Sequence, residues 1–155
     1  MHFSGTTRTR ELICKGGYNS RENMKVSAQT TIQVVDTLDR LAWLYDRKDI
    51  DGIMALIAPD FSGFGTGRDE RVSGSDQFRN AVERDFSQCD SFRLSFSEME
   101  IGAEGTTAWV TAACTMNVVI DGSQKIFEGR ITAVLRGTGH AWQFVQIHLS
   151  LPAGG

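Results

Sequence analysis

The sequence lacks the residue patterns that mark several classes of protein. Its three cysteines, Cys14, Cys89 and Cys114, are odd in number, far apart and outside any CxxC or Cys/His pattern. Neither a disulfide framework nor a zinc site is therefore expected, and we predict that the protein binds no metal. The chain also has no phosphate-binding loop, nucleophile elbow or dinucleotide fingerprint, so we predict no cofactor.

Long apolar runs and a basic stripe are absent too. No segment reaches the roughly 18 apolar residues of a membrane helix, and the start of the chain lacks the apolar centre of a secretory signal. The formal net charge is −3, and residues 1–26 are basic, so the remainder is more acidic still. Such a surface attracts neither nucleic acid nor an anionic membrane. We therefore predict a cytoplasmic protein without either partner.

What the chain does contain fits one globular domain. It has 155 residues, of which 41% are hydrophobic and 23% charged, enough to bury a sizeable core. Residues 1–25 are rich in Gly, Ser, Thr, Arg and Asn. We predict that they form a disordered tail or lie upstream of a true start at Met24. The domain then spans residues 26–155.

Three segments in the first part of this domain repeat apolar residues with the spacing of an amphipathic helix. The first covers residues 27–47. A second, shorter helix is capped by Asp49 and stopped by Pro59. A brief strand is expected over residues 60–67, and the third helix covers about residues 73–88.

After the third helix the apolar period changes to that of strands. Glycine-containing turns separate four alternating segments, so neighbouring segments should pair as an antiparallel meander. Helices followed by strands indicate an α+β fold with the helices on one face of a curved sheet. Such a sheet leaves a hollow beneath the helices. The four segments cover residues 92–101, 108–120, 125–136 and 141–151.

Charged side chains lie among the apolar residues of the last two strands. Alternation places Glu128, Arg130 and Thr132 on one face of one strand, and Phe144 and His148 on one face of the next. Because buried charge is costly unless it is paired or used, we predict that this face lines a pocket. There Arg130 can bind an oxyanion and His148 can carry a proton. A structural cluster of ion pairs and hydrogen bonds among Glu128, Arg130 and His148 is the alternative.

The alternate faces of these strands are apolar as well. Cys114, Met116 and Val118 share one of them, and Ile147 and Leu149 share another. A sheet that is apolar on both faces must be covered on both. We therefore predict that this second, outer face packs against a second copy of the chain, giving an isologous homodimer.

Several short segments resemble the SnoaL-like branch of the nuclear transport factor 2-like (NTF2-like) superfamily. The resemblance covers roughly residues 28–152 and implies a cone-shaped α+β fold, related to the cystatin-like fold, in which three N-terminal helices close a strongly bent antiparallel sheet around a pocket. Proteins of this superfamily include polyketide cyclases, ketosteroid isomerases, dehydratases, dioxygenase subunits and associative domains, so the fold does not decide the chemistry. The segments are Ala58-Pro59-Asp60-Phe61, Gly74-Ser75-Asp76-Gln77-Phe78-Arg79, Gly129-Arg130-Ile131-Thr132 and Trp142 to Pro152.

The chain differs from ketosteroid isomerases at the positions of both catalytic residues, the carboxylate base and the tyrosine. Gly65 stands where the resemblance places the carboxylate base, and we expect no other residue to replace it there. The tyrosine of the first helix falls near Leu41, although Tyr45, one turn later, can partly replace its phenol. Ketosteroid-type isomerisation is therefore not expected. Asp60 resembles an aspartate common in the superfamily, and a local capping role is its structural alternative.

These observations predict a SnoaL-like protein that binds a small, partly apolar organic molecule whose anionic end lies near Arg130. The alternatives are an associative homo-oligomerisation module without catalysis, or a cofactor-independent isomerase, cyclase or dehydratase. The candidate catalytic residues are His148, Arg130 and Asp60. The predicted ligand-binding residues are Tyr45, Phe64, Trp109, Glu128, Arg130, Thr132 and His148.

Overall fold

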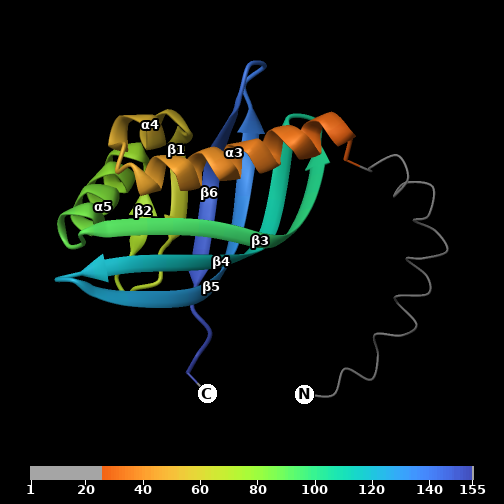
Figure 1. The fold of residues 1–155 in the computed structure, drawn as a ribbon. Helices are drawn as coiled ribbons and strands as arrows, with labels where there is room; N and C mark the ends of the chain where they lie inside the picture. Colours follow the sequence, from red (N-terminus) through yellow and green to blue (C-terminus); the bar gives the residue numbers. More distant parts are fainter. Residues whose placement is uncertain (1–25, 155) are drawn as a thin grey trace, which may run out of the picture.

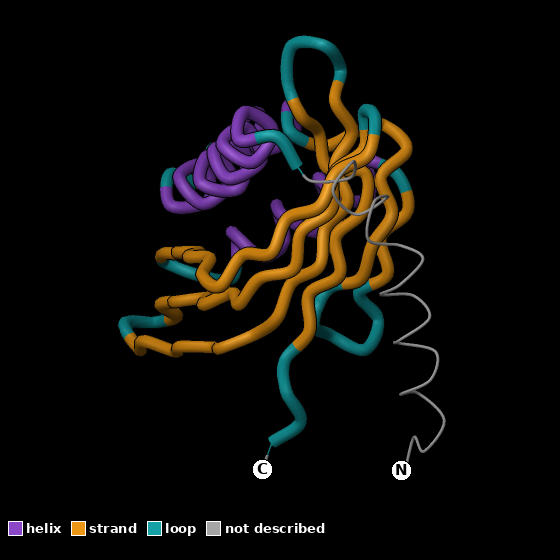
Figure 2. The backbone as a smooth tube through the Cα atoms, turned by 90° about the vertical axis from the view of Figure 1, so that its right-hand side faces the viewer, coloured by secondary structure: helices purple, strands orange, loops and turns teal. Residues whose placement is uncertain are grey.

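A computed structural model describes residues 26–154 as three helices packed on one side of a six-stranded sheet. Figure 1 shows the helices along one side of the strands, and Figure 2, turned by a quarter, shows the sheet bending beneath them. The predicted α+β architecture is confirmed, and the sheet itself remains unclosed. The predicted tail of residues 1–25 and the alternative start at Met24 lie outside the described residues.

Two long helices form where the apolar repeat predicts them. The first, α3 (Ala28–Asp46), begins after Ser27, whose side chain accepts a hydrogen bond from the backbone N–H of Thr30 at 3.1 Å. Its buried residues recur every three or four positions, so one face packs into the core. The other, α5 (Ser75–Ser87), buries Val82 and Phe86 in the same way.

The second helix is shorter than predicted. It covers only Ile50–Ala55 (α4), and the strand β1 (Ile57–Phe64) begins two residues later. Pro59 does not stop a helix, because it lies within this strand. A proline restricts the preceding residue to extended backbone, and it lacks the N–H of a regular strand pair. The pairing of β1 with its neighbour is accordingly irregular between Ile57 and Ser62.

The four alternating segments all form strands. After β2 (Arg71–Ser73) and α5 come β3 (Ser91–Glu104), β4 (Thr107–Ile120), β5 (Ser123–Gly137) and β6 (Trp142–Ser150). The strands lie in the order β2-β1-β6-β5-β4-β3. The pair of β1 and β6 is parallel, and the other pairs are antiparallel.

Two irregularities interrupt the long strands. The pairing of β5 with β6 shifts between Val134 and Leu135, so that Val134 faces Gln146 while Leu135 faces Phe144, and Val145 is the extra residue. The pairing of β3 with β4 shifts between Ser97 and Glu100, and Glu98 there has a φ of 53°. Both have the form of a β-bulge, which bends a strand and exchanges the faces of its two halves.

The inner face of the sheet, which faces the helices, carries the residues that we expected on the outer face. Cys114, Met116 and Val118 from β4 and Ile147 and Leu149 from β6 line the space beneath the helices. The expected assignment of the faces is therefore wrong. The bulge at Val145 explains the error, because Phe144 points into the core before the bulge whereas Ile147 and Leu149 point inward after it.

Candidate functional site

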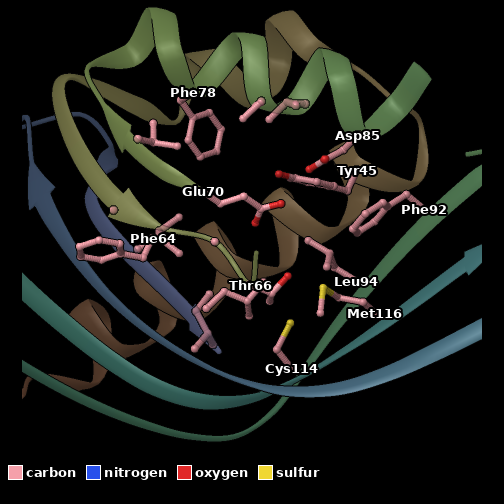
Figure 3. A pocket seen from close by; sticks show the side chains of 18 of the residues that line it. Tyr45, Phe64, Thr66, Glu70, Phe78, Asp85, Phe92, Leu94, Cys114 and Met116 are labelled. Carbon is pink, nitrogen blue, oxygen red and sulfur yellow. The ribbon is translucent and has the colours of Figure 1, made fainter. Parts of the chain in front are cut away.

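A cavity of about 570 Å³ opens between α5, the last turns of α3 and the inner face of the sheet. Figure 3 shows α5 above this space and the bent strands below it. Aromatic rings pack along its walls. The ring centroids of Tyr45 and Phe92 lie 5.4 Å apart, and those of Phe61 and Phe78 lie 4.9 Å apart. Most of its lining is apolar. The sheet contributes Phe92, Leu94 and Phe96 from β3, Cys114, Met116 and Val118 from β4, Ile131 from β5, and Ile147 and Leu149 from β6.

Tyr45 is placed in the cavity by the last turn of α3. Its side chain points inward, as Figure 3 shows, and no hydrogen bond joins its hydroxyl to another described residue. Burial raises the pKa of this phenol well above its ordinary value, and the charge of Asp85 raises it further. The hydroxyl therefore stays protonated and can donate a hydrogen bond to a ligand.

Asp85 faces Tyr45 from α5. It follows Phe78, Ala81 and Val82 at helical spacing, so one helix face presents these four residues to the cavity. Burial raises the pKa of the Asp85 carboxyl, the charge of Glu70 raises it further, and the charge of Arg84 opposes both. A carboxyl group whose pKa is raised by burial in a cavity is a candidate for proton exchange with a ligand.

Glu70 brings a second carboxyl group into the cavity from the loop between β1 and β2. It accepts a hydrogen bond from the backbone N–H of Gly67 at 3.0 Å, and it lies 3.8 Å from the guanidinium of Arg84. The carboxylate lies so close to Gly65 that a Cβ atom at this position would overlap it. The loop thus folds a carboxylate back onto Gly65, the position where the resemblance places a base and where we expected no replacement.

The floor of the cavity holds sulfur atoms from Cys114 and Met116. Burial raises the pKa of the Cys114 thiol to about 11. The thiol is therefore protonated at neutral pH and contributes an apolar surface, as a small buried hydrophobic residue does.

Two of the seven predicted ligand-binding residues, Tyr45 and Phe64, line the cavity. Phe64 borders it at the end of β1, where its ring is 51% exposed and lies 5.5 Å from the imidazole of His148. The others do not line it. Trp109, Glu128, Arg130, Thr132 and His148 alternate with inward-facing residues and are exposed on the outer face of the sheet.

The prediction that the face of Arg130 and His148 lines the hollow beneath the helices is therefore wrong. Ile131, Ile147 and Leu149 point inward, so their strand neighbours must point outward. The ion-pair alternative is not observed either, since no salt bridge within residues 26–154 joins Glu128, Arg130 or His148.

Asp60, the third catalytic candidate, forms an ion pair with Arg136 outside the cavity. Its two carboxylate oxygens accept hydrogen bonds from one Arg136 nitrogen at 3.0 and 2.9 Å, on the surface beside β1 and β5. It is not among the residues that line the cavity. This pair ties two strands together across the intervening strand β6, which is a structural role.

The sequence contains a feature that indicates a functional role for Asp85, although the predicted site did not include this residue. An acidic residue stands on the apolar stripe of an amphipathic helix, seven residues after Phe78. No comparable sign existed for Glu70, because its position depends on the fold of an irregular loop.

Within residues 26–154, no group of three or more His, Cys, Asp or Glu side chains is placed to hold a metal ion. None of the described helices is long and apolar enough to span a membrane.

Comparison with known proteins identifies the family and the fold. A family model described as a SnoaL-like domain matches residues 34–154. No curated protein sequence matches the chain. An NTF2-like protein of unknown function from Pseudomonas putida has a TM-score of 0.74 at 21% identity, over 84% of this chain and 92% of that one.

Two further solved structures are similar in fold. A candidate dehydratase of the NTF2-like family from Streptomyces avermitilis has a TM-score of 0.76 at 16% identity, over 83% of this chain and all of that one. A protein of unknown function with a cystatin-like fold from Nostoc punctiforme has a TM-score of 0.67 at 16% identity, over 84% of this chain and 97% of that one. At these identities the similarity establishes the fold alone.

Proposed function

Because the chain belongs to the family of SnoaL-like domains, we propose that its cavity binds a small, largely apolar organic molecule that carries a polar group. The observation that supports this proposal is the Tyr45 hydroxyl beside the Asp85 carboxyl in a cavity whose lining is mostly apolar. Ligand sites commonly combine apolar walls with a few convergent polar groups. The volume of about 570 Å³ also lies within the usual range of roughly 300–1,000 Å³.

Binding can be tested with the neutral fluorescent probe N-phenyl-1-naphthylamine, whose emission rises in apolar surroundings. The variant Ala81→Phe places a ring in the cavity from α5. We expect this variant to weaken the probe's affinity at least tenfold, equivalent to about 1.4 kcal/mol, because the ring occupies the binding space.

Glu83→Phe is the matched control, since Glu83 is exposed on the same helix and does not line the cavity. This variant should bind the probe as the wild type does. Failure of the wild-type protein to bind the probe, or equal loss of binding in both variants, would contradict the proposal.

A cofactor-independent acid–base reaction is a second candidate function. It is favoured by the two carboxyl groups, Asp85 and Glu70, one of which has a pKa raised by burial and by the charge of the other. The candidate dehydratase among the similar structures supports this choice of reaction class.

A simple substrate for this test is 4-hydroxy-4-phenylbutan-2-one, whose loss of water gives a conjugated enone that absorbs in the ultraviolet. A carboxylate removes the proton next to the carbonyl, and the hydroxyl group leaves as water after protonation. We expect acceleration over buffer that Asp85→Asn reduces by roughly 100-fold and that Asp76→Asn, at an exposed position of α5, leaves unchanged. Absence of acceleration would leave binding as the function.

We also propose that the chain forms a homodimer through the outer face of the sheet. This face carries the exposed side chains of Trp109 and Ile126, which are 41% and 58% exposed. Both alternate with inward-facing residues of β4 and β5. A large exposed aromatic residue on a sheet face favours association with a second sheet.

A further inference from the structure

The ionised side chains around the cavity are mostly acidic. Three carboxyl groups line it, those of Asp69, Glu70 and Asp85, against the guanidinium groups of Arg71 and Arg84. Arg84 is partly neutralised by Glu70, at 3.8 Å. The cavity therefore presents more negative than positive charge to a bound molecule.

Asp85 is a cavity carboxylate that forms no salt bridge among the described residues. It is half-buried, and no Lys or Arg nitrogen among residues 26–154 lies within 4.0 Å of it. A charge that is partly removed from water without a partner is unfavourable. A ligand that brings a positive charge to this carboxylate supplies the missing partner.

Tyr45 provides an independent sign of the same ligand. Its hydroxyl is unpartnered among the described residues and points into the cavity beside Asp85 (Figure 3), so its oxygen can accept a hydrogen bond from a ligand N–H. Its ring packs against that of Phe92, with the ring centroids 5.4 Å apart, and an aromatic face attracts a cation placed over it.

We infer that the cavity selects a protonated amine with an apolar body over a neutral or anionic molecule of the same shape. The ammonium group lies between Asp85 and the Tyr45 hydroxyl, and the apolar body lies along Leu94, Cys114 and Met116. This inference rests on the proposed binding function. It replaces the expectation of an anionic ligand near Arg130, which is exposed on the outer face.

Three molecules of one shape test this selection: 4-phenylbutylamine, 4-phenylbutan-1-ol and 4-phenylbutanoate, each measured by displacement of N-phenyl-1-naphthylamine at pH 7. The amine is protonated there because alkylamines have pKa values of about 10. We expect the amine to bind at least tenfold more tightly than the alcohol, and the carboxylate to bind most weakly. An alcohol or carboxylate that binds as tightly as the amine would overturn the inference.

The variant Asp85→Asn assigns the preference to one side chain, since it keeps the shape and removes the charge. We expect this variant to bind the amine and the alcohol with equal affinity. Asp76→Asn, on an exposed part of the same helix, should retain the preference for the amine. A preference that survives in Asp85→Asn would overturn the assignment.

The pH dependence of amine binding tests the role of Asp85 separately from folding, because a folding defect would weaken the binding of the amine and the alcohol alike. The charged and titratable groups facing Asp85 are Glu70 and Arg84, and the phenol of Tyr45 is the neighbour on α3. Binding of the amine should weaken as the pH falls through the pKa of Asp85, which burial and Glu70 raise, while binding of the alcohol stays constant.

The outcomes separate the two proposals. If neither the naphthylamine probe nor any of the three molecules binds, the proposed binding function and the inference both fail. If the neutral molecules bind and the amine has no advantage, binding stands and the inference alone fails.

Discussion

Asp85 illustrates how one side chain acquires its properties from its surroundings. The helix α5 is amphipathic, with an apolar face toward the cavity. The carboxyl group of Asp85 lies on this apolar face. Burial and the neighbouring Glu70 raise its pKa. The energetic penalty of this placement is the basis for our proposal that Asp85 serves a ligand, because an apolar residue at this position would avoid it.

This raised pKa predicts how stability changes with pH. The folded protein retains the Asp85 proton at pH values where the unfolded chain has released it, so stability falls as the pH rises from about 4, the usual value for aspartate, through the raised pKa. Asp85→Asn removes this titration. We expect the variant to have a higher Tm than the wild type at pH 7 and a similar Tm near pH 3.

Circular dichroism melts over this pH range measure the difference directly. Asp76→Asn serves as the control and should follow the wild-type profile. A constant offset between Asp85→Asn and the wild type at every pH would show that the substitution acts through packing and not through this titration.

At the scale of the element, the position of α5 over the cavity depends on one lysine. Lys48, in the connection between α3 and α4, donates hydrogen bonds through Nζ to the carbonyl oxygens of Phe86 and Cys89 at 3.1 and 2.6 Å. These carbonyls belong to the end of α5 and the residues just after it, where a positive charge is favourable. Lys48 thus fastens the last turn of the helix to the neighbouring layer.

Replacing Lys48 with Met keeps most of the side-chain length and removes the donor. We expect a loss of about 1–3 kcal/mol in the free energy of unfolding, because two partly buried carbonyls lose a charged partner, together with weaker binding of the naphthylamine probe. Urea denaturation measures the first effect. Lys125→Met, at an exposed position of β5, is the control, and equal stability of both variants would contradict this role.

The elements were more predictable from the sequence than the faces that they present. Apolar periodicity is a local property, so it located α3, α5 and the four long strands. The faces of β6 could not be predicted from local periodicity, because one extra residue, Val145, forms a bulge that exchanges the faces of the two halves of the strand. The exchange placed His148 outside the cavity and turned Ile147 inward, whereas Arg130 lies outside because it alternates with the buried Ile131 on the regular strand β5.

The residues of the candidate site also differ in how far the sequence could predict them. Tyr45 was predictable because it stands on a strong helical repeat, one turn after the position near Leu41 at which the resemblance places a tyrosine. Asp85 was within reach of the same periodicity. Glu70 was not, since its place against Gly65 depends on a loop whose only signals are its glycines.

For the molecule as a whole, the proposed homodimer gives a test at the outer face. Trp109 packs its indole over Gly102 of β3 and remains 41% exposed. We expect Trp109→Ser to shift the protein from dimer to monomer at micromolar concentration, measured by sedimentation velocity, because the substitution removes the largest apolar side chain of that face.

Trp43→Ser is the matched control, since Trp43 is 51% exposed on α3, away from the sheet. This variant should sediment as the wild type does. A wild-type protein that is monomeric throughout the concentration range would refute the dimer.

The bulge in β3 has a consequence for how copies of this chain can meet. An unclosed sheet has two edges, and a long, regular edge strand readily accepts a strand from another molecule, which leads to open-ended aggregates. Here one edge, β2, has three residues, and the other, β3, is interrupted near Glu98, where the backbone turns to a φ of 53°. Neither edge offers a long continuous template, which disfavours strand addition and leaves the face of the sheet as the surface for the proposed dimer.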